Sequence, residues 1–323
     1  QKLDVSFDSF YGHVSRRIVF DNILFQEAKK FAADVIEGFT VTGVVFENGK
    51  VVGIKGTRAG EKEGEIFRAN VVVGADGANS VVARETGLAK FQPNHHASAI
   101  RVYYKNIKGL VNKLEVYFFD NIMPGYFWIF PLENGMANVG VGMSTDVIQK
   151  RKANLQELML NEIKTNPLLT ERFKDAQMVE GSLRGWNLPL ATAKRKMYGN
   201  GFVLLGDAAS LIDPFTGEGI GNGMLSAKVA SIVINEAFKK NDYSEKILEH
   251  YDKLLTKEIG KELKASYTLQ GIGNFIFRFK WFRNFLYKKV IKRPALISAI
   301  SASFSYDNTD KPSPLKLLKE FIF

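Results

Sequence analysis

Cysteine is absent from all 323 residues of the chain. This excludes disulfides, thiolate metal sites, iron–sulfur ligation and a cysteine nucleophile within the sequence. The absence also fits a reducing compartment, so we expect a cytoplasmic protein. Long apolar runs are missing as well, because none approaches the about 20 residues that a membrane-spanning helix needs. With 46% apolar and 24% charged residues, the composition is that of a globular protein.

Histidine is scarce, with four residues in the chain. His95 and His96 are adjacent, but a metal site needs three or four convergent ligands, and the surrounding sequence has no matching spacing. We therefore predict no metal site and place this pair on a solvated loop. Ser80 and Ser210 have no histidine at a motif spacing, so the sequence gives no support to hydrolysis by a Ser-His-Asp triad.

Acidic residues are fewer than basic ones. The chain has 34 Asp and Glu and 44 Lys and Arg, which gives a net charge of +10. Residues 275–293 carry seven of the basic residues, no acidic residue and many aromatic ones. Such a segment favours peripheral contact with a membrane surface or with an acidic partner. The alternative is a packed terminal helix with solvated lysines. The basic residues do not form a nucleic-acid module, so we expect no nucleic-acid binding.

The order of helix-like and strand-like segments predicts an α/β fold. The run Val71-Val72-Val73 is typical of a strand that is buried on both faces. Residues 93–195 are rich in aromatic, strand-like segments and indicate an inserted antiparallel sheet. The spacing of apolar residues predicts helices over 20–36, 153–165 and 219–239, and strands over 39–47, 51–57, 66–74, 99–105, 113–120, 126–131, 136–143, 178–184 and 202–205. After residue 243 the pattern is helical, with loops predicted at 271–273 and 307–314.

The first motif is Gly74-Ala75-Asp76-Gly77, which follows the predicted buried strand. Its glycines allow a sharp turn and a close approach to a ligand. Asp76 follows the carboxyl end of the strand, where open α/β sheets bind ligands. Ser80 is placed to cap the next helix. An ordinary strand-to-helix turn is the alternative, because Asp-Gly is common in turns.

The second motif is Gly206-Asp207, which follows the predicted strand at 202–205. Asp207 is an acceptor suited to the hydroxyls of a sugar or a ribitol chain. A helix then begins among four closely spaced glycines, whose backbone N–H groups can face a pyrophosphate or an electron-rich ring. These are Gly217, Gly219, Gly221 and Gly223. So many glycines at a helix start are unfavourable unless another group must come close.

In order and context, these two motifs resemble the flavin fingerprints of glutathione-reductase-type FAD enzymes with the p-hydroxybenzoate hydroxylase fold. The resemblance implies FAD as the cofactor. It implies that Asp207 contacts the flavin ribitol and that Asp76 and Gly77 lie near the pyrophosphate. The other cofactor residues that it implies are Gly206, Pro214, Gly217, Gly219 and Ile220.

A third segment narrows the resemblance to geranylgeranyl reductases. Tyr126-Phe127-Trp128-Ile129-Phe130-Pro131, followed after eight residues by Gly140-Val141-Gly142, is similar to their Tyr-x-Trp-x-Phe-Pro…Gly-x-Gly signature. Residues 17–24 resemble the start of a helix in that family, which implies that Arg17 lies near the flavin. Alternate residues of a strand share a face. Tyr126, Trp128 and Phe130, with Gly140 and Gly142, therefore either line an apolar substrate channel or pack in a core.

The family's fold opens with a strand, a Gly-x-Gly-x-x-Gly motif and a helix that bind the ADP half of FAD. This sequence has no such motif near its start, so we interpret it as lacking the family's N-terminal dinucleotide-binding segment. The expected architecture is a three-layer FAD-binding domain (1–92 and 196–242, partial), an inserted antiparallel substrate domain (93–195) and a helical C-terminal cap (243–323).

The resemblance implies an FAD-dependent oxidoreductase that reduces geranylgeranyl-type C=C bonds by hydride transfer from reduced flavin. The substrate would be an isoprenoid lipid or diphosphate, with NADPH, NADH or ferredoxin as electron donor. The residues that we single out do not identify a proton donor. One alternative is an FAD-dependent monooxygenase or halogenase, and another is an inactive flavin-binding or lipid-binding fragment.

Overall fold

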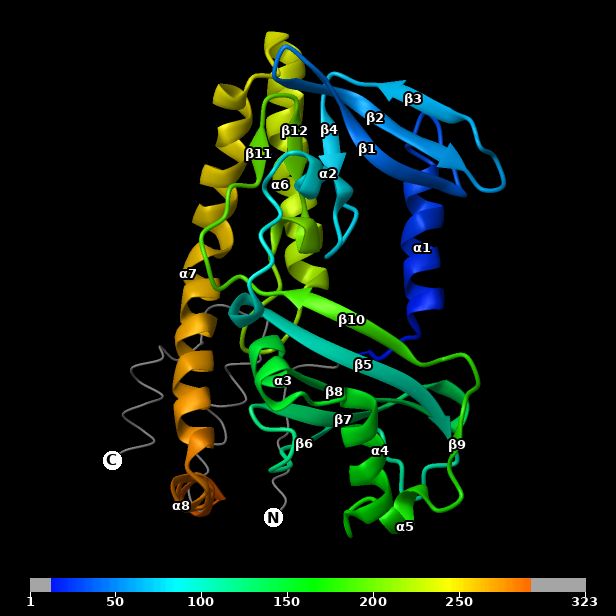
Figure 1. Cartoon of the computed structure of the whole chain (residues 1–323), viewed down its shortest axis with the longest axis vertical. Helices are drawn as coiled ribbons and strands as arrows, with labels where there is room; N and C mark the ends of the chain where they lie inside the picture. The colour runs from blue at the N-terminus through cyan, green and yellow to red at the C-terminus, as the bar shows by residue number, and fades with distance from the viewer. Residues whose placement is uncertain (1–12, 292–323) are drawn as a thin grey trace.

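The computed structural model describes residues 13–291, and its architecture is α/β, as predicted (Figure 1). Residues 1–12 and 292–323 lie outside the described residues. They include the loop predicted at 307–314 and the last two residues of the basic segment 275–293. None of the helices between residues 13 and 291 is long and apolar enough to cross a membrane.

The smallest sheet carries both glycine motifs. Its order is β11 (Tyr198–Gly199), β12 (Phe202–Leu204) and β4 (Val72–Gly74). β12 and β4 are parallel, and Leu204 is paired with Gly74. The two strands therefore end at the same edge of the sheet, and the segments that follow them become neighbours.

A second sheet is a meander of β1 (Phe39–Glu47), β2 (Lys50–Arg58) and β3 (Gly64–Arg68). Asn48 and Gly49 form its first turn with φ angles of 49° and 74°, which confirms the predicted hairpin. The single strand predicted over 66–74 is wrong, because β3 and β4 belong to different sheets. The chain leaves the meander after Arg68 and enters the parallel sheet at Val72.

The largest sheet is antiparallel, with the order β10-β5-β8-β7-β6 and with β9 paired to β5. Its strands are β5 (His96–Lys105), β6 (Glu115–Tyr117), β7 (Gly125–Pro131), β8 (Met136–Ser144), β9 (Gln177–Met178) and β10 (Arg184–Pro189). The single strand predicted over 178–184 is wrong, because residues 179–183 form the turn between β9 and β10. The sheet has its own core, in which Phe127, Ile129 and Val141 pack with Met159 of a neighbouring helix. The helices beside it are α3 (Thr145–Arg151), α4 (Leu155–Thr165) and α5 (Thr170–Phe173).

A second core joins the parallel sheet to the short helix α2 (Val81–Glu85) and to two long helices, α6 (Ile220–Lys240) and α7 (Glu245–Arg278). The buried Tyr251 of α7 donates a hydrogen bond to the Leu204 carbonyl at 2.9 Å and ties the helix to β12. The loop predicted at 271–273 is wrong, because α7 continues through it. An isolated glycine costs a helix only about 1 kcal/mol, which a long helix tolerates. α8 (Lys280–Ile291) follows α7.

Helix α1 (Arg17–Lys29) lies between the meander and the large antiparallel sheet in Figure 1. The helix predicted over 20–36 therefore begins and ends earlier than expected. None of its residues is buried, and Ile18 is 75% exposed. The prediction that β4 is buried on both faces is also wrong, because Val73 is 43% exposed while Val72 is buried.

Candidate functional site

The two glycine motifs meet because β4 and β12 end side by side. Gly74 and Leu204 are paired in register, so Asp76 and Asp207 follow at the same edge of the sheet. Asp207 and the residues that directly follow the first motif, Ala78, Asn79 and Ser80, line a common cavity. The structure thus brings together two segments that are more than a hundred residues apart in the chain.

Asp76 has a structural role in the turn after β4. Its Oδ2 accepts hydrogen bonds from the backbone N–H groups of Val81 at 2.7 Å and Val82 at 3.3 Å. Ser80 Oγ accepts from the N–H of Ala83 at 2.9 Å, which confirms the predicted helix cap. Both side chains therefore satisfy the first turn of α2, whose amides have no helical partner. Gly77 has a φ of +76°, and its turn requires glycine for this conformation.

Asp207 lies in the short 3₁₀ turn Gly206–Ala209, directly after β12. Burial raises the pKa of its carboxyl group, and the positive charge of Arg17 opposes that shift. Arg17 is at the start of α1, where its Nε donates to Asp21 at 2.8 Å. Among the described residues, no donor hydrogen-bonds the Asp207 carboxylate. A partly buried acceptor of this kind is suited to bind ligand hydroxyls.

The glycines around Asp207 bring two backbones close together. A Cβ at Gly206 would lie 3.4 Å from the Cα of Gly223 in the first turn of α6. A Cβ at Gly219 would lie 3.3 Å from Asp207 Oδ1 and 3.0 Å from Ile212. The start of α6 therefore approaches the Gly-Asp turn, and larger residues would push the two apart.

The loop before α6 is organised by Asp213, which the sequence analysis did not single out. Its Oδ1 accepts from the N–H groups of Phe215 at 2.9 Å and Thr216 at 2.8 Å. The Pro214 carbonyl accepts from Gln270 of α7 at 2.8 Å. The loop ends at Gly217, with a φ of +78°, and α6 then begins at the exposed Ile220. An Asp followed by Pro, Thr and Gly is a turn signal that could have identified this anchor.

Strand β7 alternates between two environments. Phe127 and Ile129 are fully buried in the core of the large sheet, whereas Tyr126, Trp128 and Phe130 are partly exposed on the other face. The rings of this second face follow one another, with centroids 5.8 Å apart for Tyr126–Trp128 and 6.1 Å apart for Trp128–Phe130. A continuous aromatic row therefore lies on the face away from the core.

Gly140 and Gly142 lie on β8, opposite this aromatic row. A Cβ at Gly140 would be 2.2 Å from Trp128 Cζ2, so the indole ring lies across the glycine. At Gly142 the nearest atom would be 3.5 Å away, which is ordinary contact. Trp128 Nε1 donates to Asn138 Oδ1 at 3.1 Å and fixes the ring. The first glycine of the Gly-x-Gly pair thus makes space for the tryptophan.

Tyr126 connects the aromatic row to the glycine loop. Its hydroxyl donates to the Thr216 carbonyl at 3.1 Å, and a Cβ at Gly217 would lie 3.4 Å from the same hydroxyl oxygen. Burial raises the pKa of Tyr126, so its phenol keeps the proton at neutral pH. The large sheet and the Asp207 region are joined at this contact.

The prediction of solvated histidines is wrong. His96 begins β5 and is buried, with Nδ1 2.8 Å from the Gln92 carbonyl oxygen and its ring 4.7 Å from that of Phe91. His95 Nδ1 lies 2.6 Å from the hydroxyl of Thr192. Burial lowers the pKa of both histidines. The strand pattern that begins at His96 is the signal that could have placed it in the sheet.

This arrangement defines the class of the protein. The Gly-Asp turn and the glycine-rich helix start, beside an antiparallel sheet, form the fold of FAD-dependent oxidoreductases. A geranylgeranyl bacteriochlorophyll reductase-like protein from Thermoplasma acidophilum superposes with a TM-score of 0.74 at 29% identity, over 94% of this chain and 71% of that protein. The myxobacterial chondrochloren halogenase, an FAD-dependent halogenase, shares the fold. It superposes with a TM-score of 0.62 at 23% identity, over 77% of this chain and 57% of the halogenase.

Sequence comparison identifies the family. The geranylgeranyl reductase catalytic domain matches residues 95–181, which include β5 to β9. A digeranylgeranylglycerophospholipid reductase from Thermoplasma acidophilum is 34% identical over 78% of this chain, and one from Thermoplasma volcanium is 36% identical over 76%. The chain belongs to the geranylgeranyl reductase family of FAD-dependent oxidoreductases. It spans 62% and 60% of the length of these two relatives.

Proposed function

We propose that the protein reduces C=C bonds in the isoprenoid chains of a lipid, with FAD as the cofactor. The observation that carries the proposal is the 34–36% identity to digeranylgeranylglycerophospholipid reductases over three quarters of the chain. The aromatic row on β7 is consistent with a branched hydrocarbon substrate, because such chains bind in mostly apolar sites. An isoprenoid diphosphate carries the same chain and is the second substrate form that we consider.

The residues around Asp207 fit FAD. Its carboxylate is partly buried, lacks a donor among the described residues, and can accept hydrogen bonds from ribitol hydroxyls. Gly206 and Gly219 keep the backbone close to this point, and Arg17 adds a positive charge near it. When bound and reduced, FAD supplies the hydride, while the protein contributes orientation and exclusion of water. We assign Asp76 and Gly77 to the turn near the pyrophosphate.

The chain's own residues position the substrate. Trp128 and Phe130 present an apolar wall, and Gly140 lets the Trp128 ring lie flat against β8. Tyr126 retains its proton and donates it in the hydrogen bond to Thr216. We infer that Tyr126 holds the loop containing Pro214 and Gly217 against the substrate sheet rather than supplying a proton.

The decisive experiment is anaerobic turnover. The purified protein, loaded with FAD and reduced with dithionite, is incubated with digeranylgeranylglycerophospholipid, and the lipid is examined by mass spectrometry. The proposal predicts mass gains in steps of two hydrogens, and loss of bound flavin and product in Asp207→Ala. A product that forms only with oxygen would instead identify a monooxygenase or halogenase, whose fold the chain shares. A preparation that cannot retain flavin would favour an inactive fragment.

The electron donor can be identified in the same preparation. NADPH, NADH and reduced ferredoxin are each added without oxygen, and the bleaching of the flavin absorbance is followed. The physiological donor is expected to bleach the flavin at a rate that supports turnover, because cofactor reduction must precede each cycle.

We also propose peripheral membrane contact through residues 275–291, in a cytoplasmic protein whose substrate is a lipid. Trp281 is 71% exposed, and Phe275 and Phe285 are exposed as well. Lys280 pairs with Asp120 at 2.7 Å, which anchors the start of α8 to the loop between β6 and β7. Trp281→Ala should weaken binding to anionic vesicles, most clearly at low salt. Phe31, an exposed aromatic residue just after α1, provides the matched control variant Phe31→Ala. An equal loss of vesicle binding in both variants would contradict the proposal.

A further inference from the structure

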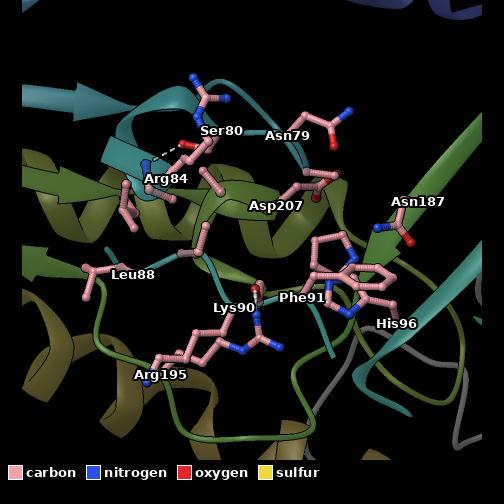
Figure 2. Close-up of a pocket in the computed structure, with 18 of the residues that line it drawn as sticks. Asn79, Ser80, Arg84, Leu88, Lys90, Phe91, His96, Asn187, Arg195 and Asp207 are labelled. Carbon is pink, nitrogen blue, oxygen red and sulfur yellow. Dashed lines mark hydrogen bonds between the residues drawn. The ribbon is translucent and has the colours of Figure 1, made fainter. Parts of the chain in front are cut away.

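A cavity of about 230 Å³ lies between α2, the Gly-Asp turn and β10. Asp207 forms part of its wall, but the other walls contain residues that the flavin assignment does not use. They include Phe91, His96, Asn187 and Arg195. Figure 2 shows the Phe91 and His96 rings together below Asp207, with Asn187 beside them.

Arg195 is an unusual cation in this wall. Its Nη1 donates to Ser210 Oγ at 2.9 Å, while its Nη2 is buried without a hydrogen-bond partner. Burial lowers the pKa of the guanidinium, and no carboxylate of the described residues forms an ion pair with it. A guanidinium nevertheless stays charged in proteins. A buried charge without a partner is unfavourable, so an anionic ligand would relieve it.

The surrounding groups specify the chemistry of that anion. Asn187 Oδ1 is also buried without a partner and can accept a hydrogen bond from a ligand hydroxyl. Lys90 lines the same cavity and adds positive charge, whereas Lys196, also in its wall, is paired with Glu245 at 2.7 Å. Arg84 contributes less, because its guanidinium points away from the cavity in Figure 2. The unpartnered Nη2 of Arg195, with Lys90 in the same wall, suits the charged oxygens of a phosphate.

We propose that this cavity binds an organic phosphate, with the phosphate at Arg195 and an adjacent ligand hydroxyl at Asn187. Two sources share this chemistry: a glycerophosphate headgroup and the sugar phosphate of a nucleotide. The proposed contacts use Arg195 and Asn187 and do not use the carboxylate of Asp207, which lines the same cavity. It also goes beyond the proposed reduction of isoprenoid chains, because no reacting atom is required in it.

Calorimetric titration tests the proposal with four probes: inorganic phosphate, glycerol 1-phosphate, NADPH and FAD. Arg195→Gln should weaken binding of the phosphate probes by about tenfold or more, since charge-assisted hydrogen bonds are lost. Arg184→Gln is the control, because that exposed arginine donates only to the carbonyls of Gly181 and Leu183. Preference for glycerol 1-phosphate identifies a headgroup site, and preference for NADPH identifies a nucleotide site.

Thermal melting without ligand distinguishes a binding role from a structural one. Removing an unpaired buried cation should leave the melting temperature of Arg195→Gln unchanged or higher. A lower melting temperature with unchanged phosphate affinity would overturn the proposal, as would an effect on FAD alone or wild-type protein that binds none of the phosphates. Asn187→Ala, which keeps the Arg195–Ser210 contact, provides a second variant. It should weaken the binding of glycerol 1-phosphate more than the binding of inorganic phosphate. These measurements need no turnover, so their outcome is independent of the reductase proposal.

Discussion

The large antiparallel sheet and the small sheet that contains β4 and β12 differ in how completely helices and other segments cover them. In the large sheet, Phe127 and Ile129 are fully buried against α4 and its neighbours. On the other side of the molecule, α1 buries none of its residues, and Val73 of β4 is exposed. The large sheet thus has a complete core of its own, whereas the region around α1 and β4 leaves apolar residues uncovered.

The largest expected effect lies in the core of the large sheet. Phe127→Ala should lower the free energy of unfolding by about 3–5 kcal/mol, because it leaves a cavity in a closed core. Chemical denaturation measures this difference. Phe31→Ala is the control, since Phe31 is 88% exposed on the uncovered side and its truncation should change stability little. If both variants lost the same unfolding free energy, the two regions would not differ in how tightly they are packed.

A smaller effect is expected where Trp128 crosses β8. Gly140→Ala would place a Cβ 2.2 Å from Cζ2 of the indole and 2.4 Å from the Ile100 carbonyl oxygen, so the strands must shift. We expect a loss of about 1–3 kcal/mol in unfolding free energy. Gly142→Ala has 3.5 Å of space and should be tolerated. If both variants were equally stable, the indole would not depend on Gly140.

Asp207 gives a pH-dependent prediction on the cofactor side. Burial raises the folded-state pKa of its carboxyl group above the ordinary value of 3.8, so ionisation of Asp207 disfavours the folded protein without ligand. This contribution to stability is present at low pH and is lost as pH rises through the raised pKa. Asp207→Asn should therefore stabilise the flavin-free protein at neutral pH, with a gain that shrinks as pH falls toward that value.

Unfolding curves of wild type and Asp207→Asn across this pH range make the measurement. The same variant should retain FAD less well, because an amide is a weaker acceptor for ribitol hydroxyls than a carboxylate. A stability gain that did not depend on pH would contradict the role of ionisation.

The smallest effect concerns the contact between the two regions. Tyr126→Phe removes the hydrogen bond to the Thr216 carbonyl and should cost about 0.5–1.5 kcal/mol of unfolding free energy. Because the phenol positions the loop, flavin retention should fall slightly while the substrate sheet stays folded. Loss of all product with normal flavin binding would instead point to Tyr126 as a proton donor.

Local patterns predicted much of this structure. Asn48-Gly49 fixed a hairpin, the glycine-rich stretch before Ile220 marked the start of α6, and the alternation along residues 126–130 separated the two faces of β7. These features depend on backbone conformation and on the period of apolar residues, which neighbouring residues determine. The apolar run 71–73 predicted a strand and residues 20–36 a helix; both elements exist, but with other bounds and less burial than predicted.

The sequence by itself determined many of the elements, the turn at Asn48-Gly49 and the two glycine motifs, because each depends on residues that are close in the chain. Only the tertiary structure decided that Val73 is exposed, that His96 is buried, and that Arg195 faces a cavity shared with Asp207. Burial depends on which distant segment packs against a residue. The register of β12 with β4, and the pairing of β10 with β5, are long-range contacts that no local pattern specifies.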